Sequence, residues 1–140
     1  LTRAALEATM MKYLRPGEAL ADLRILRALT EPLAEVGKRA KRLAALLRRT
    51  LPEGMRVSLV AGVSMAGGGS LPMREIPTVL VGIRPDRLSA AALEGRLRRG
   101  AVPIIVRVSD DTVLFDLRTI DPEEVPAIRD GLKAAAGGTR

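Results

Sequence analysis

Two arginines and an aspartate lie close together in the second half of the chain, in a pattern that suits anion binding. If Asp110-Asp111 is a two-residue turn between strands, Arg107, Asp116 and Arg118 project from one face of the hairpin. Guanidinium groups bind phosphate and carboxylate through paired hydrogen bonds. The pattern predicts an anion site. The spacing leaves an alternative open, which is a surface ion pair between Arg107 and Asp116 beside a solvated Arg118.

A second charged group makes the first half of the chain basic. The net charge is +7, and residues 1–50 contain 11 basic residues against five acidic ones. Much of the excess comes from a stretch that contains no acid: Lys38, Arg39, Lys41, Arg42, Arg48 and Arg49. Tyr13 and Phe115 are the only aromatic residues, which excludes a platform for stacking bases. Two interpretations of the basic stretch stay open: contact with nucleic-acid phosphates, or the solvated face of an amphipathic helix.

Composition excludes several other kinds of chemistry. The chain has no Cys and no His, so disulfides, thiol nucleophiles, imidazole bases and the usual zinc ligand sets are absent. The acidic residues form no cage-like cluster, and we expect no metal site. No apolar run is long enough to span a membrane, and we expect a cytoplasmic protein. The chain begins at Leu1 rather than Met, from which we expect a piece of a longer protein.

Apolar periodicity predicts that helices make up the first half of the chain and that they position the basic stretch. The expected helices cover residues 2–14, 18–29 and about 31–50. In the third helix, residues at steps of three and four predict one buried side, with the basic residues turned outward: Leu33, Val36, Ala40, Leu43 and Leu47.

The second half alternates between strands and helices, which predicts an α/β domain with a mostly antiparallel sheet. Strands are expected at 55–63, 77–83, 103–109 and 112–118, and a helix capped by Ser89 runs to about residue 99. Asp121-Pro122-Glu123-Glu124 resembles a capping box that opens a final helix. The hairpin face opposite the arginines predicts a core surface: Ile104, Val106, Val108, Val113, Phe115 and Leu117. We therefore expect a helical lead-in at 1–50 and a small domain at 51–140.

The glycine run Gly67-Gly68-Gly69-Ser70 lacks the context of a phosphate-binding loop. A Walker-type loop needs Gly-Lys-Ser/Thr opening a helix, and a dinucleotide loop needs a helix behind it. Here Leu71-Pro72 and a predicted strand follow, so the run indicates a turn or a close backbone approach.

Five segments, in order, resemble bacterial selenocysteine synthase, the pyridoxal-phosphate enzyme L-seryl-tRNA(Sec) selenium transferase. Leu1–Tyr13 (LTRAALEATMMKY) is similar to the stretch that follows the family's cofactor lysine, and Leu26–Thr30 (LRALT) resembles a motif further on. Ala66–Pro72 (AGGGSLP), Pro103–Val108 (PIIVRV) and Phe115–Thr119 (FDLRT) resemble three more. The resemblance covers essentially the whole chain.

This resemblance implies the small C-terminal domain of a fold-type I pyridoxal-phosphate enzyme, preceded by connecting helices. The implied reaction converts seryl-tRNA(Sec) to selenocysteinyl-tRNA(Sec), with selenophosphate as the selenium donor and the cofactor as electron sink. The family is also expected to form a homo-oligomer built from dimers.

Residue by residue, the resemblance implies a binding role for this chain rather than a catalytic one. The Schiff-base lysine is expected just before Leu1, so the chain alone is expected to be inactive. Arg27 matches a substrate- or phosphate-binding position, and Arg118 lies where related enzymes keep an arginine for a carboxylate. Arg107 is the third candidate. We expect Arg27 and Arg118 to converge on one anion.

Two other functions remain open from the sequence. The first is the small domain of a related pyridoxal-phosphate lyase that acts on a phosphorylated amino sugar acid. The second is a stand-alone basic module that binds the RNA backbone through residues 38–49.

Overall fold

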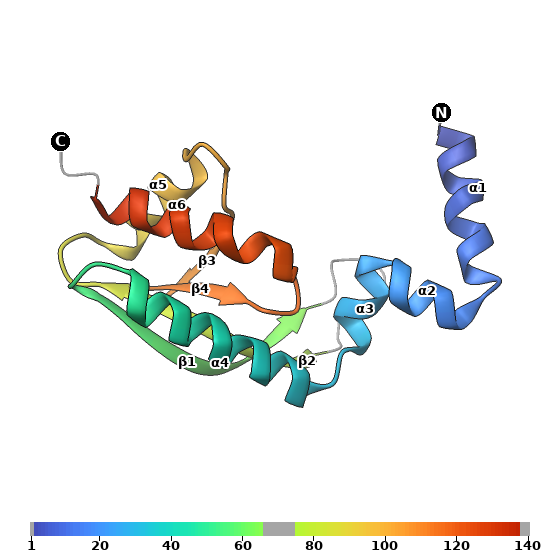
Figure 1. Ribbon diagram of the computed structural model, residues 1–140, viewed down its shortest axis with the longest axis horizontal. Helices are drawn as coiled ribbons and strands as arrows, with labels where there is room; N and C mark the ends of the chain where they lie inside the picture. Colours follow the sequence, from blue (N-terminus) through green and yellow to red (C-terminus); the bar gives the residue numbers. More distant parts are fainter. Residues whose placement is uncertain (1, 66–74, 138–140) are drawn as a thin grey trace. The chain divides into compact units, whose positions relative to one another are not determined.

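The computed structural model describes residues 2–65 and 75–137, and the chain divides into two compact units, Leu1–Pro32 and Leu33–Arg140 (Figure 1). The long helix that carries the basic stretch belongs to the second unit, with the sheet. The sequence predicts instead that this helix is part of the lead-in at 1–50.

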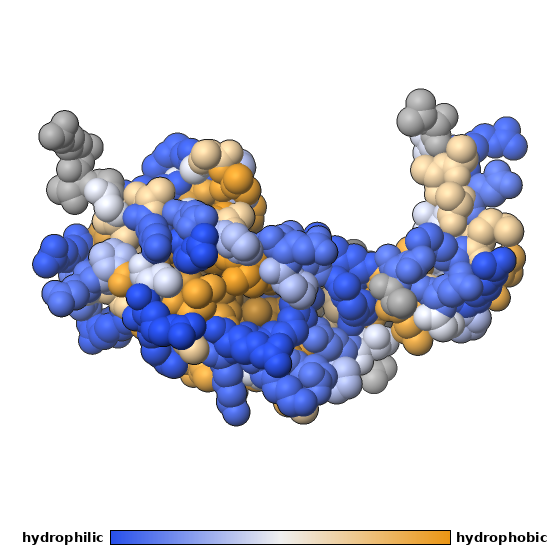
Figure 2. Space-filling model, viewed as in Figure 1, coloured by the Kyte–Doolittle hydropathy of each residue, from blue (hydrophilic) through white to orange (hydrophobic). Residues whose placement is uncertain are grey.

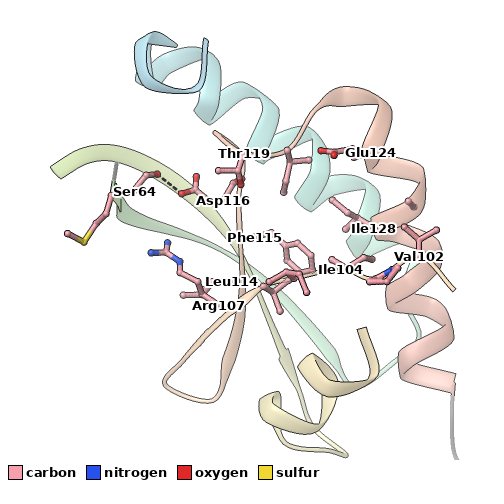
Figure 3. Close-up of a pocket in the computed structure, with 16 residues that line it drawn as sticks. Ser64, Val102, Ile104, Arg107, Leu114, Phe115, Asp116, Thr119, Glu124 and Ile128 are labelled. Carbon is pink, nitrogen blue, oxygen red and sulfur yellow. Dashed lines mark hydrogen bonds between the residues drawn. The ribbon is translucent and has the colours of Figure 1, made fainter. Parts of the chain in front are cut away.

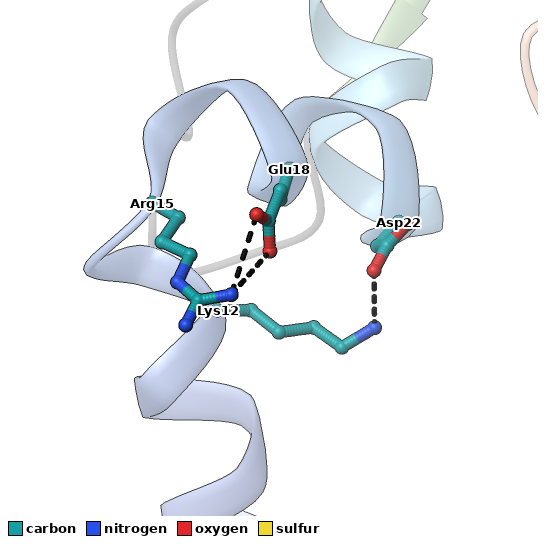
Figure 4. A network of polar contacts seen from close by, with 4 residues as sticks. All are labelled: Lys12, Arg15, Glu18 and Asp22. Carbon is teal, nitrogen blue, oxygen red and sulfur yellow. Dashed lines mark hydrogen bonds and ion pairs between the residues drawn. The ribbon is translucent and has the colours of Figure 1, made fainter.

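The first unit consists of three helices: α1 (Thr2–Tyr13), α2 (Pro16–Asp22) and α3 (Arg24–Thr30). The single helix expected at 18–29 is wrong, because Leu23 adopts an extended conformation (φ −89°, ψ 104°) and separates α2 from α3. Figure 4 shows the ion pairs at the turn between α1 and α2. Lys12 Nζ lies 2.7 Å from Asp22 Oδ2, and Arg15 Nη1 lies 3.3 Å from Glu18 Oε2.

The second unit is built on an antiparallel sheet with the strand order β1-β2-β4-β3 among the described residues. The strands are β1 (Met55–Met65), β2 (Glu75–Pro85), β3 (Arg107–Ser109) and β4 (Thr112–Asp116). Strands β1 and β2 pair along their whole length. The α/β class and the antiparallel sheet expected from the sequence are confirmed.

The predicted two-residue hairpin is also confirmed. Asp110 and Asp111 both have positive φ (49° and 54°), as a turn that matches the twist of the strands requires. Arg107 pairs with Leu114 in the expected register.

Two expectations about this hairpin are wrong. The strand predicted at 103–109 is only three residues long, because the Ile104 N–H bonds to the Leu97 carbonyl (3.0 Å) instead of continuing the ladder. Val108, expected in the core, is 43% exposed, since β3 is an edge strand with a neighbour on one side only. Val113, Phe115 and Leu117 are buried as expected.

Three helices pack against the sheet: α4 (Leu33–Thr50), α5 (Ala90–Arg98) and α6 (Val125–Gly137). Figure 1 shows α4 and α6 in front of the strands. The predicted stripe of α4 is buried at Val36, Ala40, Leu43 and Leu47. Leu33 is the exception, at 45% exposed, because it is the first residue of the helix. One cluster joins these residues to the sheet through Val81, Ile83, Val113 and Phe115 and to the other helices through Leu93, Leu97, Ile128 and Leu132.

Two predicted helix starts of this unit are confirmed, whereas α4 begins at Leu33 rather than at about residue 31. Ser89 accepts a hydrogen bond from Ala92 N–H (3.1 Å) at the start of α5. Asp121 and Glu124 form the capping box, in which the Asp121 N–H donates to Glu124 Oε2 (2.7 Å). A short 3-10 turn, η1 (Pro122–Glu124), leads directly into α6. None of the described helices has the length and apolar character needed to cross a membrane.

Truncation of Leu47 tests the packing of α4. Leu47 is fully buried, so Leu47→Ala should lower the free energy of unfolding by about 3 kcal/mol, through lost burial and the cavity left behind. Leu33→Ala makes the same chemical change at an exposed position of the same helix and should cost less than about 0.5 kcal/mol. Urea unfolding followed by far-UV circular dichroism measures both values. Equal losses in the two variants would contradict the burial of α4.

Candidate anion site and adjoining cavity

Asp116, at the end of β4, connects three strands of the sheet. Its carboxylate accepts hydrogen bonds from Thr78 Oγ1 (2.8 Å), the Arg118 backbone N–H (3.1 Å) and the Ser64 hydroxyl. Thr78 is only 2% exposed, so its hydroxyl depends on this acceptor. The hairpin spacing predicts that Asp116 can pair with Arg107, but no ion pair between them occurs within the described residues.

Arg118 is a buried arginine whose side chain donates hydrogen bonds to a backbone carbonyl. Strand β4 ends at Asp116, where a turn closes through the Thr119 N–H and the Asp116 carbonyl (3.1 Å). The strand predicted at 112–118 is therefore too long. The Arg118 side chain donates to the Pro77 carbonyl from Nε (3.1 Å) and Nη2 (2.7 Å), and the residue is 8% exposed. The alternative of a solvated Arg118 is wrong, because Pro77 and the Asp116 carboxylate hold both the side chain and the backbone.

Arg107 is exposed, unlike Arg118. Its Nη1 lies 3.4 Å from the Val63 carbonyl, at the long limit for a hydrogen bond. This contact leaves the guanidinium beside a cavity that Arg118 does not line. The two arginines predicted to share a hairpin face therefore have different surroundings.

The cavity, about 620 Å³ in volume, opens between β4, the segment before β3, and α6. Figure 3 shows Arg107, Asp116 and Ser64 at one end, with Ile104 and Ile128 further in. The cavity exists because the chain before β3 turns toward α5 and leaves the edge of β4 unpaired beyond Leu114. The polar described residues that line it are Ser64, Arg107, Asp116, Thr119 and Glu124, which provide one cation, two carboxylates and two hydroxyls.

Arg27 lies on α3 in the first unit and is exposed. Arg27 and Arg118 belong to different units, so their convergence stays a prediction. The glycine-rich motif Ala66–Pro72 lies outside the described residues. It connects β1, which carries Ser64, to β2, which carries Thr78.

The four lysines of the chain lie on helices, away from the cavity. Lys12 and Lys38 form ion pairs with acidic neighbours at 2.7 Å, and Lys41 and Lys133 are exposed on helices. None of the four lines the cavity. The described residues also contain no group of three or more carboxylates that could hold a metal ion.

The network around Asp116 was only partly predictable. The spacing of Arg107, Asp116 and Arg118 pointed to this end of the hairpin, but Thr78 and Ser64 were not expected there. They reach Asp116 because β2 pairs with β4 in a register that sets Leu80 opposite Asp116. No local signal in the sequence encodes that register.

The fold and the site thus define a small α/β unit with an antiparallel sheet and a buried arginine beside its polar network. Comparison with known proteins assigns it to a family. The model of the family SelA, L-seryl-tRNA selenium transferase, matches residues 1–121. This chain belongs to the L-seryl-tRNA selenium transferase family.

Curated relatives agree with this assignment. The L-seryl-tRNA(Sec) selenium transferase of Nitratidesulfovibrio vulgaris is 42% identical over 137 residues, 98% of this chain and 29% of the relative. Those of Geotalea uraniireducens and Moorella thermoacetica are 41% and 40% identical over 97% and 96% of this chain, again 29% of each relative. The chain thus spans less than a third of the length of these relatives, and it corresponds to their C-terminal part.

Replacing Arg118 and Arg107 in turn tests whether the buried arginine stabilises the fold more than the exposed one. Arg118→Ala removes a buried guanidinium and leaves the Pro77 carbonyl without its donor, so the free energy of unfolding should fall by about 2 kcal/mol. Arg107→Ala removes the same side chain from an exposed position and should cost less than about 0.5 kcal/mol. Thermal unfolding of the two variants makes the comparison. An Arg118→Ala protein as stable as the unsubstituted chain would show that the hydrogen bonds to the Pro77 carbonyl do not stabilise the fold.

Proposed function

We propose that this chain is the C-terminal part of a pyridoxal-phosphate-dependent enzyme that converts seryl-tRNA(Sec) to selenocysteinyl-tRNA(Sec) with selenophosphate. The observation that carries the proposal is identity of about 40% along nearly the whole chain to several transferases of that name. The small antiparallel α/β unit agrees with the C-terminal domain that the resemblance implies.

In this proposal the chain binds and orients, and bond making takes place on residues outside it. None of the described lysines lines the cavity, which supports the proposal that the lysine attaching the cofactor lies outside this chain. Orientation of a bound substrate is itself a large contribution to rate, because it removes the entropic cost of bringing the reactants together. The hydrogen bonds that Asp116 accepts from Thr78 and from the Arg118 backbone support that role, because they hold this end of the sheet together.

The arginines are the groups proposed to hold anions. Seryl-tRNA is an ester and has no free carboxylate, so the proposed ligands of Arg27, Arg107 and Arg118 are phosphate groups of the tRNA or selenophosphate. Arg118 is already held at Pro77, which fixes the direction of its guanidinium plane. The proposal also includes a cytoplasmic homo-oligomer built from dimers.

Cofactor labelling tests the assignment of the lysine. The 140-residue chain, incubated with pyridoxal phosphate and reduced with borohydride, should carry no stoichiometric adduct on any lysine, since none lies in the cavity. Mass spectrometry of proteolytic peptides detects the adducts, and reduction without pyridoxal phosphate is the control. Stoichiometric labelling of a single lysine would place the attachment site inside this chain.

A chimera tests the function itself. This chain replaces the matching 137 residues of the Nitratidesulfovibrio vulgaris relative, and conversion of seryl-tRNA(Sec) is measured with radioactive selenophosphate. The chimera should be active, and the relative without its C-terminal part should not be. Within the chimera, Arg27→Ala should reduce turnover by about tenfold or more without lowering the melting temperature, since it removes a charged hydrogen bond to an anion. An inactive chimera that folds and assembles would contradict the proposal.

A further inference from the structure

The structure separates the six basic residues of 38–49 into two groups. Arg39 donates to the Ile120 carbonyl, and Arg48 donates to the Val57 carbonyl from Nε (3.3 Å) and Nη2 (3.2 Å). These two contacts join the flanks of α4 to the chain before η1 and to β1. Arg39 and Arg48 thus have structural partners on either side of the helix.

The other four basic residues form an outer stripe along α4, defined here as Lys38, Lys41, Arg42 and Arg49. At about 3.6 residues per turn they lie opposite the buried side of the helix, and all four are exposed. Within the described residues, Lys41, Arg42 and Arg49 have no acidic partner, while Lys38 pairs with Glu35 (2.7 Å). Figure 2 shows hydrophilic side chains along this helix.

The dimensions of the outer stripe fit a phosphate backbone. From Lys38 to Arg49 it extends about 16 Å at ~1.5 Å per residue, and no acidic residue occurs between residues 36 and 52. A nucleic-acid strand carries one phosphate per ~3.4 Å of helix axis, so several phosphates lie within reach of these long side chains. The stripe has no aromatic residue on which a base could stack, and its contacts would therefore be with the backbone alone.

A membrane surface fits the outer stripe less well. Helices that lie on membranes insert an apolar side into the lipid, below their basic side. The apolar side of α4 is already buried against the sheet, at Val36, Leu43 and Leu47. Ala45 is the only apolar residue within the stripe and offers little to insert.

We propose that the outer stripe of α4 binds the phosphate backbone of RNA, independently of its sequence. That the RNA is the tRNA substrate rests on the proposed function; the contact itself rests on the arrangement of charges. Arg39 and Arg48 take no part, because their guanidinium groups are bound to carbonyls of the same unit.

Neutralising two residues of the stripe tests the proposal. The double variant Lys41→Gln/Arg42→Gln is compared with Arg3→Gln/Lys133→Gln, which removes the same two charges from exposed positions on α1 and α6. Binding of the 140-residue chain to a tRNA is measured by fluorescence anisotropy from about 50 to about 200 mM salt. The slope of log affinity against log salt should become shallower by about 1.5 in the stripe variant and stay unchanged in the control.

Three results would overturn the proposal: no measurable tRNA binding at the lowest salt, the same loss of slope in both variants, or tighter binding to vesicles containing anionic phospholipid than to tRNA. Unchanged melting temperatures exclude unfolding as the cause of any loss. The outcome is separate from that of the chimera. An active chimera with a stripe that does not bind RNA removes this inference alone, and a binding stripe in an inactive chimera removes only the proposed function.

Discussion

Burial of one side of α4 against the sheet is the interaction on which the rest of this unit depends. Leu47 and Val36 are fully buried, and they join a cluster that extends through Ile83 on the sheet to Leu93 and Leu132 on the other two helices. This cluster holds three helices against the sheet, and so determines which side of each helix faces outward. The basic residues of α4 lie outward because its apolar residues have only one place to pack.

The same packing positions the polar groups around Asp116. Phe115 is buried, so its neighbour on the strand faces the other way and reaches Thr78 and Ser64. A buried hydroxyl needs an acceptor, and Thr78 finds it in Asp116. Because these hydroxyls and the Arg118 backbone bind the carboxylate, Arg107 is left at the cavity and the two arginines have different roles in the structure.

For function, family membership and site geometry contribute different information. The similarity to transferases covers nearly the whole of this chain but less than a third of each relative, so it identifies the family without locating the chemistry. The geometry adds a cavity where Arg107 lies beside the Asp116 network.

Features that arise from neighbouring residues could be predicted from the sequence: the buried stripe of α4, the two-residue turn at Asp110-Asp111, the capping box at Asp121, and the family. The sequence did not show that the strand predicted at 103–109 would begin only at Arg107, which residues Asp116 would bind, or that Arg118 would be buried. The physical reason is that periodicity and turn chemistry act over a few residues. The partners Thr78 and Pro77 lie 38 and 41 residues along the chain from Asp116 and Arg118, and only the packed sheet brings them together.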